Sequence, residues 1–205
     1  MKLLQIKFSL LFIITASCLN GFAQNAKKVE SILEFQHTIN EEFKDPKESP
    51  LSEEDRASFK GLDFFKIDTN YVVTADFVRT PSEPPFAMPT TTDRTPIYVK
   101  YGEAYFKLKG RSYKLNIYQS QDLSANPEYF DYLFIPFTDE SNGHGSYPGG
   151  RYIDFKIPTS NKIVIDFNKA YNPYCAYSGK YSCPIPPAEN NLKIAIPVGV
   201  RYAKK

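Results

Sequence analysis

Residues 104–118 read AYFKLKGRSYKLNIY, in which two short runs of aromatic and aliphatic residues flank the sequence Lys109-Gly110-Arg111. Two such runs joined by a glycine-containing turn are typical of a β-hairpin. Similar runs lie on both sides, and no helical periodicity separates them. We therefore predict short strands over 71–77, 97–101, 104–108, 112–118, 133–137, 152–157, 163–167 and 192–196. Strands without helices between them favour an antiparallel β-sandwich or barrel-like domain over a parallel α/β sheet.

The residues before this β-rich region have a helical pattern. Between residues 27 and 44 the apolar side chains recur at steps of three and four among charged neighbours, which predicts an amphipathic helix. Ser52 is suited to cap a second, short helix that begins at Glu53 and ends by Gly61. We expect one globular domain over residues 24–205, with a helical segment at 27–60 and a β domain at 61–205. The proline-rich stretch 80–96 predicts a loop or an irregular edge.

The first 23 residues have the order of a secretory signal peptide. Lys2 and Lys7 precede an apolar stretch, and small residues follow it up to Ala23. The apolar stretch is too short and too interrupted by hydroxyl side chains for a transmembrane segment. We expect cleavage after Ala23 and export to the periplasm or the extracellular space. The sequence at 16–18 leaves a lipoprotein signal as the alternative, in which an acylated Cys18 would anchor the protein to a membrane.

The charge balance argues against nucleic acid as a partner. The whole chain has 25 Lys and Arg residues against 23 Asp and Glu residues. Two of the lysines and none of the acids lie in the predicted signal peptide, so the remaining chain is formally neutral. A neutral chain offers no electrostatic attraction to phosphate. The sequence indicates no cofactor, no later transmembrane segment and no particular oligomeric state.

Cys175 and Cys183 are the cysteines that remain after the signal peptide. In an exported protein, an even number of cysteines close in sequence predicts a disulfide bond. A thiolate metal site is the alternative, but the usual paired spacing is missing and the chain has only two histidines. We therefore predict a disulfide and no metal site.

The most unusual segment is IVIDFNKAYNPYCAYSGKYSCPIPPAENNL at 163–192. It is either a structural lock, in which Asn and Asp side chains bind buried backbone groups, or the wall of a binding pocket. Composition alone favours the lock. Its crowded tyrosines could also stack on a sugar or another planar ligand. The candidate ligand-binding residues in this segment are Asp166, Asn168, Asn172, Tyr177, Glu189 and Asn190.

A second polar cluster is TDESNGHGSYPGGRYIDF at 138–155. It lacks the spacing of a calcium loop and the ending of a phosphate-binding loop. His144 and Ser146 lie two residues apart without the strand-to-helix turn that presents a catalytic serine. The favoured interpretation is a solvent-exposed hairpin loop.

Arg151 is the remaining candidate for ligand binding. It follows a Gly-Gly turn beside apolar strands, so we expect it to be partly buried and to need a carboxylate or an anion. Asp154 and Asp166 are the expected protein partners, and pairing with either would make Arg151 a structural clamp. If Arg151 instead faces a cavity with the 166–173 loop, we expect a small anionic or polyhydroxylated ligand there.

The motifs DFNKAYNPYCAY at 166–177 and CPIPPAENNL at 183–192 resemble a bacterial family catalogued as domain of unknown function 1684. The similarity extends over roughly 33–202 and includes Ser49-Pro50-Leu51, LFIPF at 133–137 and GGRY at 149–152. The resemblance implies a compact domain and no established substrate. It also implies a recurring set of polar residues, here Arg56, Arg151, Asp166, Asn168, Asn172, Cys175, Cys183, Glu189 and Asn190.

The chain departs from this family pattern at two places. Where the family often has an acidic residue in the middle loop this chain has His144, and where the family often has Ala-Gly-Glu it has Val198-Gly199-Val200. Any activity that depends on those acids is therefore in doubt here.

These observations favour an exported soluble binding or accessory protein with a small polar pocket framed by residues 139–154 and 166–190. One alternative is a cell-envelope hydrolase, in which Asp166 or Glu189 acts as general acid or base and Arg151 holds an anionic group. The other is a structural envelope protein. No pair of nucleophile and base is visible in the sequence, which is why the binding protein is preferred.

Overall fold

The computed structural model describes the backbone of residues 2–202 and the side chains from Ala23 onward. The side chains of the predicted signal peptide, Cys18 included, therefore lie outside the described residues. The predicted helix at 27–44 is the second part of α1 (Lys2–Lys44). The second helix, α2 (Glu53–Ser58), begins as predicted, because the Ser52 side chain accepts a hydrogen bond from the Asp55 amide at 3.0 Å. Within the described part of the chain, no helix has both the length and the apolarity to cross a membrane.

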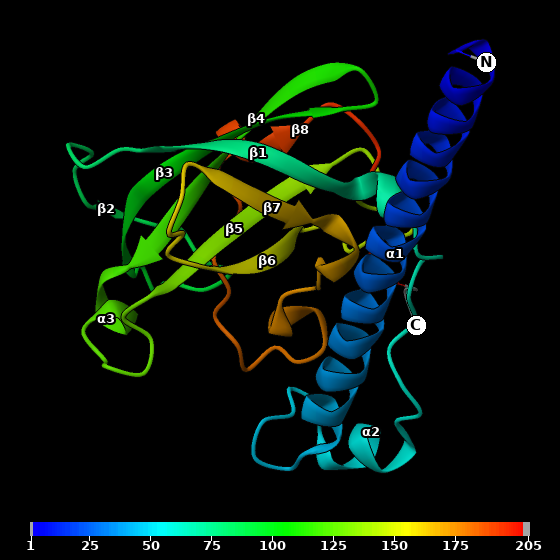
Figure 1. The fold of residues 1–205 in the computed structure, drawn as a ribbon. Coiled ribbons are helices and arrows are strands. Elements are labelled where there is room, and N and C mark those ends of the chain that lie inside the picture. The colour runs from blue at the N-terminus through cyan, green and yellow to red at the C-terminus, as the bar shows by residue number, and fades with distance from the viewer. Residues whose placement is uncertain (1, 203–205) are drawn as a thin grey trace.

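A mainly antiparallel sheet of eight strands follows, coiled into a half-barrel (Figure 1). The strands run in the order β6-β5-β4-β3-β1-β7, with β2 beside β3 and β8 beside β5. The predicted class, a mainly β barrel-like domain after N-terminal helices, is confirmed. The strands are β1 (Val72–Arg79), β2 (Phe86–Ala87), β3 (Ile97–Leu108), β4 (Arg111–Ser120), β5 (Tyr132–Asp139), β6 (Arg151–Lys156), β7 (Lys162–Asp166) and β8 (Asn191–Leu192). Short helices connect them: η1 (Thr69–Tyr71), α3 (Gln121–Ser124), η2 (Phe167–Lys169), η3 (Tyr174–Ala176) and η4 (Ala188–Asn190).

The hairpin of β3 and β4 forms where the sequence places it. Leu108 pairs with Arg111, and both turn residues have positive φ, 49° at Lys109 and 77° at Gly110. That combination is a type I′ turn, whose twist matches the strands it joins. The two strands predicted at 97–101 and 104–108 are in fact one strand with a bulge between Lys100 and Gly102. A side chain at Gly102 would come within 2.4 Å of the Phe77 ring, so the bend needs glycine.

Alternation along the strands gives the sheet two buried faces. One face carries the aliphatic core, which includes Leu115, Ile135 and Ile153. The opposite face carries an aromatic cluster that contains Tyr98, Phe134 and Tyr152 together with Met88 and Cys183. Strand β5 is buried on both faces, which explains its unbroken apolar run LFIPF.

Helix α1 lies beside the half-barrel, next to the segment that follows β7 (Figure 1). It buries Ile32, Ile39 and Phe43, and the Phe43 ring meets Tyr177 edge-on with ring centroids 4.9 Å apart. On the same side, Lys169 donates a hydrogen bond to the Ser31 hydroxyl at 2.8 Å. These contacts hold the helix over the gap between the two edge strands, β6 and β7.

Candidate functional site

A cavity of about 1160 Å³ lies between α1 and the two edges of the half-barrel. Its walls include β6 and β7, the strands at opposite ends of the sheet order, together with the loop that contains the cysteines. Coiling of the sheet therefore brings its two edges to one site, and α1 covers them. Helix residues at steps of three and four face this cavity: Gln24, Lys28, Ser31, Phe35, Thr38 and Glu42.

Aromatic rings form one wall of the cavity. The rings of Tyr98 and Phe134 lie 6.1 Å apart, those of Phe134 and Tyr152 lie 4.6 Å apart, and those of Tyr152 and Tyr171 lie 5.9 Å apart. The last two pairs meet at 71° and 88°. Rings that stand nearly at right angles make a corner rather than a flat surface, so the wall is hollowed.

Asp154 is the polar centre of this wall. Its Oδ1 atom accepts hydrogen bonds from the hydroxyls of Tyr132 and Tyr171, each at 2.6 Å. The side chain is exposed, yet protein atoms surround it densely. Asp154 is also one of the residues that line the cavity. Burial raises the pKa of Asp154, and the two hydroxyl donors offset this rise only in part.

Both tyrosine partners keep their protons at neutral pH. Burial raises the pKa of Tyr132 and that of Tyr171 well above the ordinary value, and the Asp154 charge raises both further. The two phenols are therefore fixed as donors to Asp154.

Charge is distributed unevenly along the cavity. Lys27 and Lys28 lie near the start of the described part of α1, and Glu42 lies on the same helix close to its end at Lys44. Burial, followed by the Asp154 charge, raises the pKa of Glu42. Glu42 is thus close enough to sense Asp154, and the two carboxyl groups make one end of the cavity acidic.

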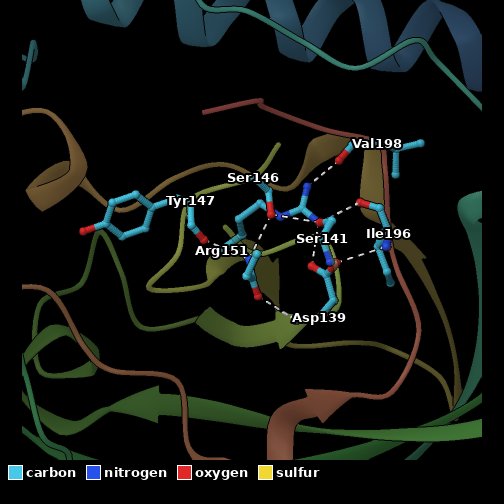
Figure 2. A network of polar contacts seen from close by, with 8 residues as sticks. Asp139, Ser141, Ser146, Tyr147, Arg151, Ile196 and Val198 are labelled. Atoms are coloured by element: carbon cyan, nitrogen blue, oxygen red, sulfur yellow. Dashed lines mark hydrogen bonds and ion pairs between the residues drawn. The ribbon is translucent and has the colours of Figure 1, made fainter. Parts of the chain in front are cut away.

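Arg151 lies elsewhere, in a buried polar network (Figure 2). Its guanidinium pairs with Asp139 at 2.7 Å, and neither side chain is exposed. It also donates to the Ile196 carbonyl at 2.8 Å and to the Val198 carbonyl, which ties β6 to a segment far along the chain. Of the two predicted outcomes for Arg151, the structural clamp is the one observed.

The predicted partners of Arg151, Asp154 and Asp166, are wrong. Side chains three positions apart on a strand point to opposite faces, so Arg151 and Asp154 of β6 cannot meet. Asp166 belongs to β7, at the other end of the strand order. Arg151 does not line the cavity, so the predicted pocket shared by Arg151 and the 166–173 loop is also wrong.

The exposed loop predicted for 138–155 is only partly right. Glu140 and His144 are exposed, but Asp139, Ser141 and Ser146 are buried. Asp139 Oδ1 accepts from the amides of Ser141 and Ile196, at 2.8 and 3.0 Å. The Ser146 hydroxyl bonds the Ser141 hydroxyl at 2.9 Å rather than His144. This cluster connects the end of β5 to the segment that contains Ile196.

Three predicted ligand-binding asparagines bind backbone groups, as a structural lock requires. Asn190 spans a gap between β4 and β5, because its amide nitrogen donates to the carbonyls of Asn116 at 2.9 Å and Pro136 at 2.7 Å. Asn168 holds the Asp68 backbone at 3.0 and 3.1 Å. Asn172 donates to the Arg201 carbonyl at 3.1 Å. The amide nitrogens of these residues are therefore engaged by the protein itself, whereas the side-chain oxygen of Asn172 has no hydrogen-bond partner among the described residues.

The other predicted site residues are scattered. Asp166 lines the cavity and accepts from the Asn168 amide at the start of η2. Tyr177 packs on Phe43, and Glu189 is exposed on η4. Of the seven predicted ligand-binding residues, Asp166 alone lines the cavity.

Cys175 and Cys183 lie together with their thiols unbonded. The Cys175 amide donates to the Cys183 sulfur at 3.1 Å. A hydrogen bond with the Cys183 thiol lowers the pKa of Cys175 to about 6, while burial and that same bond raise the pKa of Cys183. The two residues are therefore placed for a disulfide, which stays a prediction.

Sequence reasoning missed Asp154, Tyr132 and Tyr171 as a group. One signal was present, because alternation in β6 puts Tyr152 and Asp154 on the same face, opposite Arg151. The sequence contained no signal for the hydrogen bonds from Tyr132 and Tyr171 to Asp154, because those tyrosines come from β5 and from the loop after η2.

The comparisons with known proteins identify a family. The model of a protein family of unknown function, DUF1684, matches residues 57–201. An uncharacterised protein of Haloarcula marismortui, determined in solution by NMR, is 33% identical with a TM-score of 0.67, and the match covers 87% of this chain and 97% of that one. No curated protein matches the chain. Because the family model covers well over half of the sequence, the chain belongs to the DUF1684 family.

Proposed function

We propose that this protein is an exported binding or accessory protein that holds a small, largely apolar ligand in the cavity beneath α1. The observation that carries the proposal is the cavity itself, about 1160 Å³ in volume. Aromatic and aliphatic side chains from the sheet and from α1 line it together with charged and polar side chains, and a concave site that combines the two is typical of a small-molecule site. Export to the periplasm or beyond the cell rests on the order of residues 1–23.

The chemistry of the walls changes the expected ligand. An anionic or polyhydroxylated guest was expected because Arg151 would face it, and Arg151 is instead engaged by Asp139 and backbone carbonyls. The aromatic wall suits an apolar body, and Asp154 suits a polar group on that body.

The hydrolase is not favoured by any observation. It would need Arg151 beside Asp166 or Glu189, whereas the contacts of Arg151 go to Asp139, Ser141 and the segment 196–198. The cavity therefore supports binding as the function to be tested first.

Binding can be tested with a neutral, apolar fluorescent probe, N-phenyl-1-naphthylamine, added to the protein that begins at Gln24. We expect saturable enhancement of probe emission, excited directly so that protein fluorescence does not contribute. Thr38 is exposed and faces the cavity, so Thr38→Trp should fill part of the space and weaken binding about tenfold or more.

The matched control is His37→Trp, at an exposed neighbouring position that does not line the cavity. It should bind the probe like the parent, and both variants should keep the parent's thermal unfolding midpoint within a few degrees. Absence of saturable binding, or equal weakening in the two variants, would remove the support for a cavity ligand.

A further inference from the structure

We infer that the acidic end of the cavity is a site for an organic cation, an ammonium group carried on an apolar body. This inference rests on the proposed binding function and specifies the class of ligand. Three features of the described residues carry it: an unpaired carboxylate, the rings around it, and a second carboxyl group on the facing helix.

The carboxylate of Asp154 has no basic partner. Its Oδ1 atom is occupied by the hydroxyls of Tyr132 and Tyr171 at 2.6 Å, and no ion pair joins it to a lysine or arginine in the described part of the chain. Lys156 lines the same cavity, but its ion pair is with Asp131. Asp154 is thus a carboxylate in the cavity wall without a basic partner, and a ligand cation could form a charge-assisted hydrogen bond with it.

The surrounding rings suit a soft organic cation rather than a hydrated metal ion. Phe134, Tyr152 and Tyr171 line the same cavity as Asp154 and pack edge-on against one another. The faces of aromatic rings attract ammonium groups, and a partly enclosed corner strengthens that attraction because water is excluded. An anion at this position would be repelled by the Asp154 carboxylate and by the negative charge density of the aromatic ring faces.

Glu42 adds a second acidic group from the helix side. It comes from α1, whereas Asp154 comes from β6, and both carboxyl groups line the same cavity. Lys27 and Lys28 lie more than a dozen residues earlier on α1 and would repel a cation. The charges thus orient the ligand, with its ammonium group near Asp154 and its apolar body along Phe35 and Val164.

The test compares three decyl probes below their aggregation concentrations, decyltrimethylammonium, decanol and decanoate, each displacing the neutral naphthylamine probe from the protein that begins at Gln24. We expect the cation to bind about tenfold more tightly than decanol, and decanoate to bind least tightly. Asp154→Asn keeps an oxygen that accepts from both tyrosines, so it should keep probe binding within about twofold and abolish the preference for the cation.

The matched control is Asp166→Asn, which removes the same charge from another position in the cavity wall. It should keep the preference for the cation. Equal affinity for the cation and decanoate in the parent, or an unchanged preference in Asp154→Asn, would overturn the cation site while leaving the binding function intact. If the naphthylamine probe itself does not bind, the binding function fails together with this inference.

Discussion

Arg151 joins the edge strand β6 to a segment that lies outside the sheet. The side chain is completely buried, and its guanidinium reaches one carboxylate, one hydroxyl and two carbonyls. Burial lowers the pKa of Arg151, and the Asp139 charge opposes that change, which is the balance expected of a buried ion pair.

Loss of Arg151 should therefore be costly to stability. Arg151→Met would leave Asp139 buried without its cation, and we expect the free energy of unfolding to fall by about 3–5 kcal/mol. Urea unfolding measures the change. The control is Arg201→Met, which breaks an exposed pair with Asp63 at 3.2 Å and should cost no more than about 1 kcal/mol. Similar losses in the two variants would contradict the clamp.

For Asp154 we expect the opposite effect, because removal of its charge should stabilise the protein at neutral pH. Its pKa is raised in the folded protein, so the folded state binds the proton more tightly than the unfolded state. The free energy of unfolding then falls as pH rises from the ordinary value of an aspartate, about 4, through the raised value. We expect Asp154→Asn to unfold at the parent's temperature in acid and at a higher temperature at neutral pH. A difference that does not vary with pH would show that ionisation of Asp154 is not its cause.

At the scale of elements, the loop from η2 to η4 is fixed by side chains instead of a strand ladder. Asn168, Asn172 and Asn190 each bind backbone groups, and the cysteines lie between them. A loop held in this way keeps Tyr171 and Cys183 at the cavity wall.

We expect oxidation of this loop in the exported protein. The lowered pKa of Cys175, about 6, makes its thiolate abundant at neutral pH, and Cys183 is adjacent. The closed loop is short, so the bond should add only about 2.6 kcal/mol by the chain-entropy model. Mass spectrometry of the intact exported protein decides the matter, since a disulfide lowers the mass by two hydrogens. Two thiols that alkylate without prior reduction would contradict it.

The sequence predicts most elements because their signals are local. The β3–β4 hairpin, the Ser52 cap and helix 27–44 each depend on neighbours within a few positions. The single strand 97–108 was split in prediction because Gly102 looked like a turn, whereas it accommodates the Phe77 ring from another strand. Only the first residue of the strand predicted at 192–196 lies in β8, because the backbone amide of Ile196 binds the Asp139 side chain.

The candidate site was harder to predict because it depends on contacts between elements that are far apart in the sequence. The cavity joins α1, both edge strands and the cysteine loop, and no local pattern states how those elements approach. Arg151 drew attention as a buried charge, which was correct, but its partner is twelve residues away on the preceding strand. Charge alone does not identify a partner when several acids are near in sequence.

At the scale of the whole molecule, α1 lies outside the part of the chain that the family model matches. The match begins at residue 57, after the helix that covers the cavity. Thr38 and Glu42, which line the cavity from the helix, lie before the part that the family model matches, although the match to the solved relative covers 87% of the chain.

The N-terminus of the exported protein should be Gln24. Cleavage after Ala23 removes the predicted signal peptide and keeps Gln24 and Lys27, the first described residues of the cavity wall. Edman sequencing of exported protein checks this. An acylated Cys18 at the new N-terminus would contradict it and would place the protein on a membrane surface.

The hydrogen bonds of Arg151 also constrain when the buried network can form during folding. Its carbonyl partners lie 45 and 47 residues further along the chain. A ribosome makes those carbonyl partners after β6 and β7, whereas Asp139 is made before Arg151. Contacts between such distant residues also form slowly. The clamp is therefore complete only in a chain that extends to residue 198, and a chain truncated before Ile196 should leave the buried guanidinium without either carbonyl acceptor.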